Sequence, residues 1–177
     1  MDTSLLIGYL NLRRAVGALG LLLPALLMAT AGQAPSLSDY YHTGARDLWV
    51  GAMCTIGVML FFYNGYDRGD RVCSAIAGAA AVAVALVPVG GTTNAAHIAA
   101  ACLFFAASAA LCVRFGFGGY LPTVFNGLAA VMVLACAASF ALPANLLELE
   151  SVASSAFGAA WLLKGKVIAI ARPAAAG

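Results

Sequence analysis

Charged side chains are scarce in this sequence. Asp, Glu, Lys and Arg make up 9% of the 177 residues, whereas a soluble domain carries about 25%. Hydrophobic residues make up 63%, and the mean hydropathy is +0.96. With so few charges, the apolar side chains are expected to face lipid. We expect no separate soluble domain.

The chain also lacks the short motifs of several enzyme classes. It has no phosphate-binding glycine loop, HExxH, GxSxG or CxxCH motif. The middles of its apolar runs carry no series of charges such as a proton relay needs. The five cysteines lie within apolar runs without CxxC spacing. We interpret them as packing residues and predict neither a disulfide nor a cysteine metal site.

Long apolar runs dominate what is present. A spanning helix needs roughly 20 apolar residues, and these runs do not alternate as the strands of a membrane barrel do. We therefore predict an all-α polytopic membrane protein, a single domain over residues 1–177 with six transmembrane helices in a compact bundle. The spans are expected at about residues 15–32, 48–64, 72–89, 95–113, 123–142 and 151–171. Small residues at four-residue spacing, such as Ala77, Ala81 and Ala85, predict close helix packing.

The basic residues predict the orientation of these spans. Short cytoplasmic loops are enriched in Lys and Arg. Six crossings with both termini cytoplasmic leave only Arg46 on the outer side, and place eight basic residues on the inner side: Arg13, Arg14, Arg68, Arg71, Arg114, Lys164, Lys166 and Arg172. The net charge of +2 then reflects membrane topology, and we expect no nucleic-acid partner.

One polar stretch, residues 36–47 (SLSDYYHTGARD), is denser in reactive groups than any other part of the chain. The predicted topology brings it to the same outer face as the loops before the fourth and sixth spans. Both histidines and four of the seven acidic residues share that face. The candidate site residues are Ser38, Asp39, His42, Arg46, Asp47, Asn94, His97, Glu148 and Glu150.

Three interpretations of this polar face stay open. In the first, the groups form a structural cap, with Arg46 paired to an acid and Asp47 capping the second span. In the second, they bind a lipid head group or a small molecule. In the third, His42, His97 and Glu150 hold a zinc ion, the one cofactor that these residue types suggest, and the zinc would activate a water molecule for hydrolysis.

Other charged residues have simpler interpretations. If the last helix begins before Ser151, Glu150 is buried and pairs with Arg46 or His42; if it begins there, Glu150 is a first-turn acid favoured by the helix dipole. The turn from Asp67 to Arg71 is interpreted as solvated, and Lys164 as a residue that reaches toward anionic lipid head groups.

Several segments together resemble a family of small, uncharacterised bacterial inner-membrane proteins. They are YYHTGARDLWVG (40–51), GYDRGDR (65–71), VALVP (84–88), HIAAACLFF (97–105) and ESVASSAFGAAWLLKG (150–165). The family pattern matches His42, Arg46, Asp47, Glu150, Trp161, Lys164 and Gly165. This resemblance implies six helices in a bacterial inner membrane and no established activity.

A more distant likeness is to the membrane hydrolases that include the alkaline ceramidases and adiponectin receptors. Ser38 and His42 have the Ser-x-x-x-His spacing of that group, but the last helix of this chain has no histidine. The leading prediction is a membrane protein whose polar site binds a lipid-like ligand or is structural. A metal-dependent hydrolase of a lipid amide or ester is the first alternative. A small subunit of a larger membrane complex is the second, with membrane lipid, further copies of the chain or another membrane protein as partners.

Overall fold

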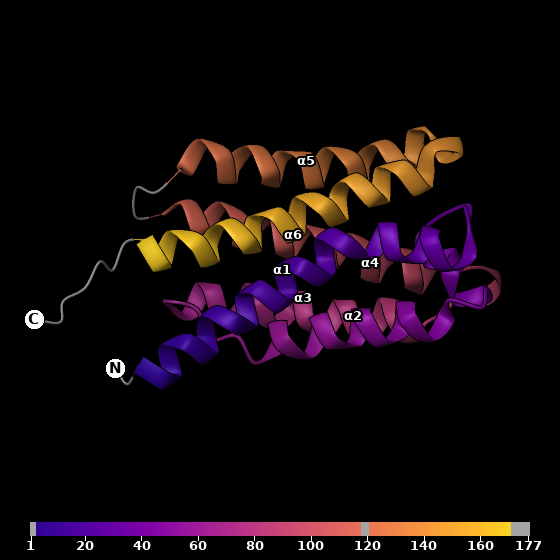
Figure 1. The fold of residues 1–177 in the computed structure, drawn as a ribbon. Coiled ribbons are helices and arrows are strands. Elements are labelled where there is room, and N and C mark those ends of the chain that lie inside the picture. The colour runs from indigo at the N-terminus through magenta and orange to yellow at the C-terminus, as the bar shows by residue number, and fades with distance from the viewer. Residues whose placement is uncertain (1–2, 118–120, 171–177) are drawn as a thin grey trace, which may run out of the picture.

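The computed structural model describes residues 3–117 and 121–170, and all regular structure in that part of the chain is helical. Short 3-10 helices lie in three of the connections: η1 (Ser38–His42), η2 (Gly91–Thr93) and η3 (Pro143–Asn145). The α-helices, drawn in Figure 1, are α1 (Thr3–Ala31), α2 (Arg46–Phe61), α3 (Arg68–Leu86), α4 (Asn94–Gly116), α5 (Pro122–Ala141) and α6 (Leu146–Ile170). The predicted all-α class with six helices is therefore confirmed for the described residues.

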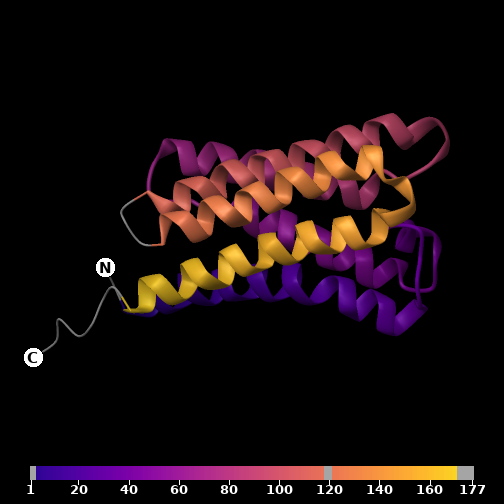
Figure 2. The same cartoon turned by 90° about the horizontal axis from the view of Figure 1, so that it is seen from above.

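The helices run up and down side by side, and α1 begins at the end of the bundle where α6 ends (Figure 1). Each helix packs against its neighbours in the chain, and α6 returns to pack along α1 (Figures 1 and 2). This pairing closes a ring, across which α4 also contacts α6. We call the end that holds Arg13 and Arg114 the arginine end, and the end that holds His42 and His97 the histidine end.

Five of the described helical segments are long and apolar enough to cross a membrane. They are residues 10–31, 68–86, 91–116, 122–141 and 143–165. Five such helices indicate a multi-pass membrane protein. Helix α2, at the predicted second span, is not among these five, because it has only 16 residues. At 1.5 Å per residue it is about 24 Å long, against about 30 Å for the hydrocarbon core of a bilayer.

Several predicted boundaries differ from the structure; helix α1, for example, begins at Thr3 rather than at about residue 15, and α3 at Arg68 rather than at about residue 72. Helix α2 ends at Phe61 rather than at residue 64, because the chain turns toward α3 through Gly65, whose φ is +60°. Helix α6 begins at Leu146, five residues before the predicted start at 151, so Glu150 lies within the helix. Residue 171, the predicted end of the sixth span, and Arg172 lie outside the described residues.

Glycine allows α1 and α6 to pack at very short range. A Cβ atom built on Gly158 would lie 2.3 Å from the backbone nitrogen of Leu21. The Ser154 hydroxyl donates across the same seam to the Gly20 carbonyl at 2.7 Å. Small residues let membrane helices approach in this way.

Helix α3 shows the same use of small residues. Ala77, Ala81 and Ala85 are fully buried, and the helix packs against both α2 and α4. The alanine spacing read from the sequence therefore predicted the buried face of this helix.

Candidate functional site

Polar and charged side chains gather at both ends of the bundle, although the sequence predicted a site at only one. The predicted site is at the histidine end, where η1 packs against α2 and α3. Within this segment the Ser36 hydroxyl donates to the Asp39 carboxylate at 2.7 Å and accepts the Asp39 N–H at 3.1 Å. The buried Tyr40 hydroxyl donates to the Gly32 carbonyl. These bonds hold the residues around Ser38 in a compact loop.

Ser38 and His97 form the most buried polar pair at this end, with 5% and 4% of their surface exposed. His97 Nε2 lies 2.8 Å from Ser38 Oγ, and His97 Nδ1 lies 2.6 Å from the Val87 carbonyl oxygen. Because a carbonyl oxygen only accepts hydrogen bonds, Nδ1 carries the proton. In the neutral imidazole, Nε2 then accepts the hydrogen bond from the Ser38 hydroxyl.

Glu150 connects the η1 segment to α6. Its Oε2 accepts the backbone N–H of Leu37 at 2.7 Å. The early start of α6 therefore places this carboxylate against a backbone donor, rather than against Arg46 or His42 as the sequence suggested. One carboxylate oxygen is satisfied in this way, and the group keeps further acceptor capacity.

A cavity of about 230 Å³ opens beside Glu150, between α4, α5 and α6. Ser38, Asn94, His97 and Glu150 line its polar part, so the structure brings together four of the predicted site residues. Its remaining wall is mostly apolar, formed by Val89, Ile98, Ala101, Phe105, Ala135, Phe140, Leu146, Leu149 and Ala153, with Ser36, Cys102, Cys136 and Ser139. A smaller space of about 30 Å³, also lined by Ser38 and Glu150, extends toward the centre of the bundle.

The other predicted site residues do not line this cavity. His42 is exposed, and its Nε2 donates to the Val89 carbonyl at 2.9 Å. Arg46 donates to the Tyr41 hydroxyl at 2.9 Å and lies over the Tyr41 ring. Glu148 is exposed on the first turn of α6. Asp39 is linked to the cavity only through Ser36.

The predicted capping role of Asp47 is wrong. Helix α2 begins at Arg46, one residue before Asp47, so its N-cap position is Ala45, and no side chain accepts a capping hydrogen bond there. Asp47 instead lies in the first turn of α2, where the helix dipole favours an acidic side chain.

The proposed zinc ligands His42, His97 and Glu150 do not form a metal site in the structure. Among the described residues, no group of three His, Cys, Asp or Glu side chains is placed to hold a metal ion. Both nitrogens of His97 are hydrogen-bonded, and His42 faces outward to the Val89 carbonyl. The arrangement therefore gives the zinc interpretation no support.

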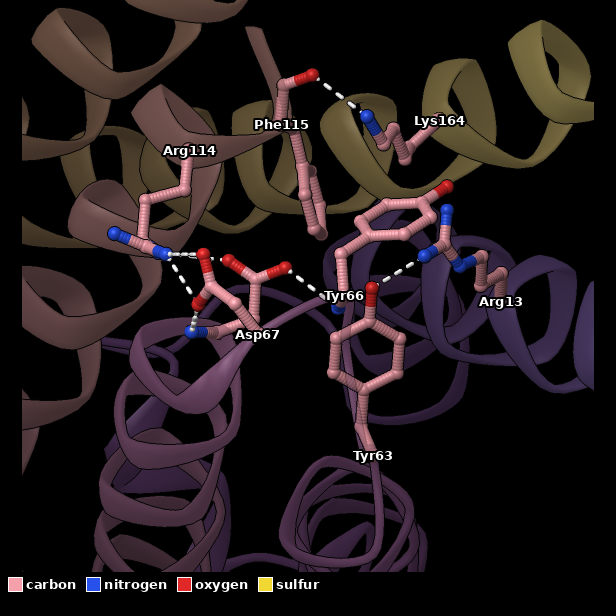
Figure 3. A network of polar contacts seen from close by, with 8 residues as sticks. Arg13, Tyr63, Tyr66, Asp67, Arg114, Phe115 and Lys164 are labelled. Atoms are coloured by element: carbon pink, nitrogen blue, oxygen red, sulfur yellow. Dashed lines mark hydrogen bonds and ion pairs between the residues drawn. The ribbon is translucent and has the colours of Figure 1, made fainter. Parts of the chain in front are cut away.

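The arginine end holds a cluster of buried charges that the sequence interpretation missed (Figure 3). Arg114 of α4 pairs through Nε with Asp70 at 2.7 Å, and its Nη2 pairs with Asp67. Asp67, Arg68 and Arg71 are exposed as the predicted solvated turn requires, but Asp70 is 4% exposed and contradicts that prediction. The Asp70 backbone N–H and the Arg114 guanidinium hold the pKa of Asp67 below its ordinary value of 3.8.

Two further cations are buried beside this ion-pair cluster. Lys164 is 6% exposed, and its Nζ donates to the Phe115 carbonyl at 2.7 Å, so it does not reach out to head groups as predicted. Arg13 is fully buried and donates to the Tyr63 hydroxyl (Figure 3). Arg13 and Lys164 both lie over the ring of Phe115.

A sequence signal for this cluster did exist. Arg13 and Lys164 lie inside the first and last helices rather than in the loops. A charged residue within a membrane helix usually faces the bundle interior, and counting these residues only as topology signals concealed that role.

Comparisons with protein-family models, with curated proteins and with solved structures found no match to this chain. The geometry of the chain alone therefore carries the functional conclusion.

Proposed function

We propose that the protein binds a lipid-like amphiphile in the cavity at the histidine end, with an amine head group beside Glu150. The observation that carries the proposal is the division of the cavity wall. Among the described residues that line it, Glu150 is the one Asp, Glu, Lys or Arg, and most of the remaining wall is apolar. Ligand sites are typically apolar cavities with a few placed polar groups.

An amine fits the chemistry of the polar part. The Leu37 N–H satisfies only part of the Glu150 carboxylate, and a buried carboxylate is costly unless it is paired. An ammonium group supplies both charge and hydrogen-bond donors to the remaining acceptor positions.

The route of entry also favours an amphiphile. Ile98 and Phe140 line the cavity and are 37% and 64% exposed on the outside of the bundle. An alkyl chain in the bilayer would therefore meet an apolar edge of the cavity before its head group reaches Glu150.

The test uses dodecylamine, dodecanol and dodecanoate as probes of the detergent-purified protein. Dodecylamine is expected to raise the unfolding free energy most, by about 2.7 kcal/mol at 100 times its Kd. Glu150→Gln removes this gain, whereas the matched variant Glu148→Gln, two residues away on the exposed surface, keeps it. Equal stabilisation by the three probes, or an equal response of both variants, would contradict the proposal.

We further propose that all six helices cross a bacterial inner membrane with both termini in the cytoplasm. Among the described residues, Arg46 is the one Lys or Arg at the histidine end, while six lie at or near the arginine end: Arg13, Arg14, Arg68, Arg71, Arg114 and Lys164. This distribution follows the positive-inside rule. An impermeant maleimide applied to intact cells is expected to label Gly44→Cys and not Arg68→Cys, and the reverse pattern would invert the orientation.

A further inference from the structure

The Ser38–His97 pair has a geometry that ligand binding does not require. Three groups lie in sequence: the Ser38 hydroxyl, the His97 imidazole 2.8 Å from it, and the Val87 carbonyl 2.6 Å from the far side of that ring. Nucleophilic serine sites share this order of nucleophile, base and group that orients the base. The three elements that supply it are η1, α4 and the end of α3.

The Ser38–His97 pair lies where a ligand in the cavity could reach it, and not on the outer surface of the protein. Ser38 and His97 both line the cavity next to Glu150, and both side chains are otherwise shielded from solvent. The hydrogen bond from Nδ1 to Val87 fixes the tautomer in which Nε2 has a free electron pair for the Ser38 proton. Val87 therefore orients the ring as the third member of a triad does.

We infer that Ser38 and His97 form a nucleophile and general base for acyl transfer from an ester that occupies this cavity. Ser38 Oγ attacks the ester carbonyl carbon and forms a new C–O bond, while its proton moves to His97 Nε2. The ester C–O bond breaks, and the leaving alcohol takes that proton. Water then attacks the acyl-serine, gives a proton to Nε2, and releases the acid as the proton returns to Ser38 Oγ. The net reaction is ester hydrolysis.

The developing oxyanion needs a hydrogen-bond donor, and Asn94 is placed to supply it. Asn94 lines the same cavity, one helical turn before His97. Its Oδ1 accepts the Gly90 N–H at 3.1 Å, which leaves the side-chain N–H groups for the cavity. Amide side chains serve this role in other acyl-transfer sites.

Glu150 also bears on the substrate class. When ionised, Glu150, close to Ser38 in the same cavity, opposes the formation of a second negative charge on the carbonyl oxygen of the ester. An ammonium group on the substrate would neutralise Glu150 and remove this opposition. This step rests on the proposed function and points to esters of long-chain amino alcohols as the substrate class.

The experiment treats the full-length protein in detergent with an alkyl fluorophosphonate, which forms a stable adduct with nucleophilic serines. Mass mapping of the unmodified protein is expected to place one adduct on Ser38. S38A abolishes labelling, and H97Q slows it by about 100-fold, the scale of general-base catalysis. The control S151A removes a serine hydroxyl of α6 that donates to the Leu147 carbonyl, and it labels at the unmodified rate.

No adduct on the unmodified protein, or an adduct that persists in S38A, would overturn the inference. Mapping on the unmodified protein needs no variant to fold. The two proposals fail separately: dodecylamine binding without labelling rejects the acyl-transfer pair alone, and Ser38 labelling that dodecylamine does not slow rejects the amine ligand alone.

Discussion

The arginine end and the histidine end both bury charged groups, but they surround them with different neighbours. At the arginine end, the rings of Tyr63, Phe115 and Trp161 pack edge to face around the cations, with ring centroids 4.9 to 6.5 Å apart. At the histidine end, the facing positions on α4, α5 and α6 are Ala101, Ala135 and Ala153. Large rings fill the space at the first end, and small side chains leave the cavity at the second.

The comparison separates two uses of a buried charge. Asp70 and Arg114 form an ion pair that links α3 to α4. The cost of removing each charge from water is therefore offset by the opposite charge of its partner. Glu150 faces a cavity, and its carboxylate accepts the Leu37 backbone N–H with the Ser38 backbone N–H beside it. A charge that is compensated by the fold stabilises the fold, whereas a charge left facing a space is available to a ligand.

The largest effect is expected from breaking the compensated pair. Asp70→Ala leaves the Arg114 charge without its buried partner and is expected to lower the free energy of unfolding by about 3 kcal/mol. Asp67→Ser is the matched control, because it also removes a carboxylate from Arg114 but keeps a capping side chain at the start of α3. Its loss is expected to be much smaller than that of Asp70→Ala, since Asp67 is exposed. Equal losses in denaturant titrations would show that Asp70 has no special role.

The next largest effect tests whether side chains are packed less tightly around the cavity than elsewhere in the bundle. Ala129 and Ala135 are both buried on α5, but only Ala135 lines the cavity. Ala129→Leu is expected to cost about 2 kcal/mol through overpacking. Ala135→Leu is expected to cost less than about 1 kcal/mol, because the added atoms enter empty space, and to prevent dodecylamine binding. A larger cost for Ala135→Leu would contradict the cavity.

The two histidines offer a smaller contrast within one end. His97→Ala removes two hydrogen bonds from buried groups and is expected to cost about 1–3 kcal/mol. His42→Ala removes one bond at the surface and is expected to change stability by less than about 0.5 kcal/mol. Thermal unfolding of the two variants in the same detergent measures this difference, and similar losses would argue against a distinct role for His97.

The smallest effect is a pH dependence at the arginine end. The pKa of Asp67 is lowered in the folded protein. Ionised Asp67 therefore stabilises the fold at every pH above the ordinary pKa of an Asp side chain. That contribution is lost as the pH falls through the lowered pKa. The stability difference between the unmodified protein and Asp67→Ser is therefore expected to shrink below about pH 4. A difference that stays constant from pH 6 to pH 3 would contradict the ion pair with Arg114.

The sequence by itself determined the helical class and the order of the helices. Apolar runs of this length leave helices as the structure that satisfies every backbone group in lipid, and Pro and Gly residues mark where those runs end. The alanine spacing in α3 also predicted its buried face, because residues four apart lie on one side of a helix.

Only the tertiary structure decided which polar groups meet. Ser38 and His97 are 59 positions apart, and Leu37 and Glu150 are 113 apart, so no local spacing could pair them. The predicted set therefore combined residues that line the cavity with exposed ones such as His42 and Arg46. Arg13 and Lys164 were misread for the same reason: whether a long cationic side chain points toward water or into the bundle depends on which neighbouring helices cover it.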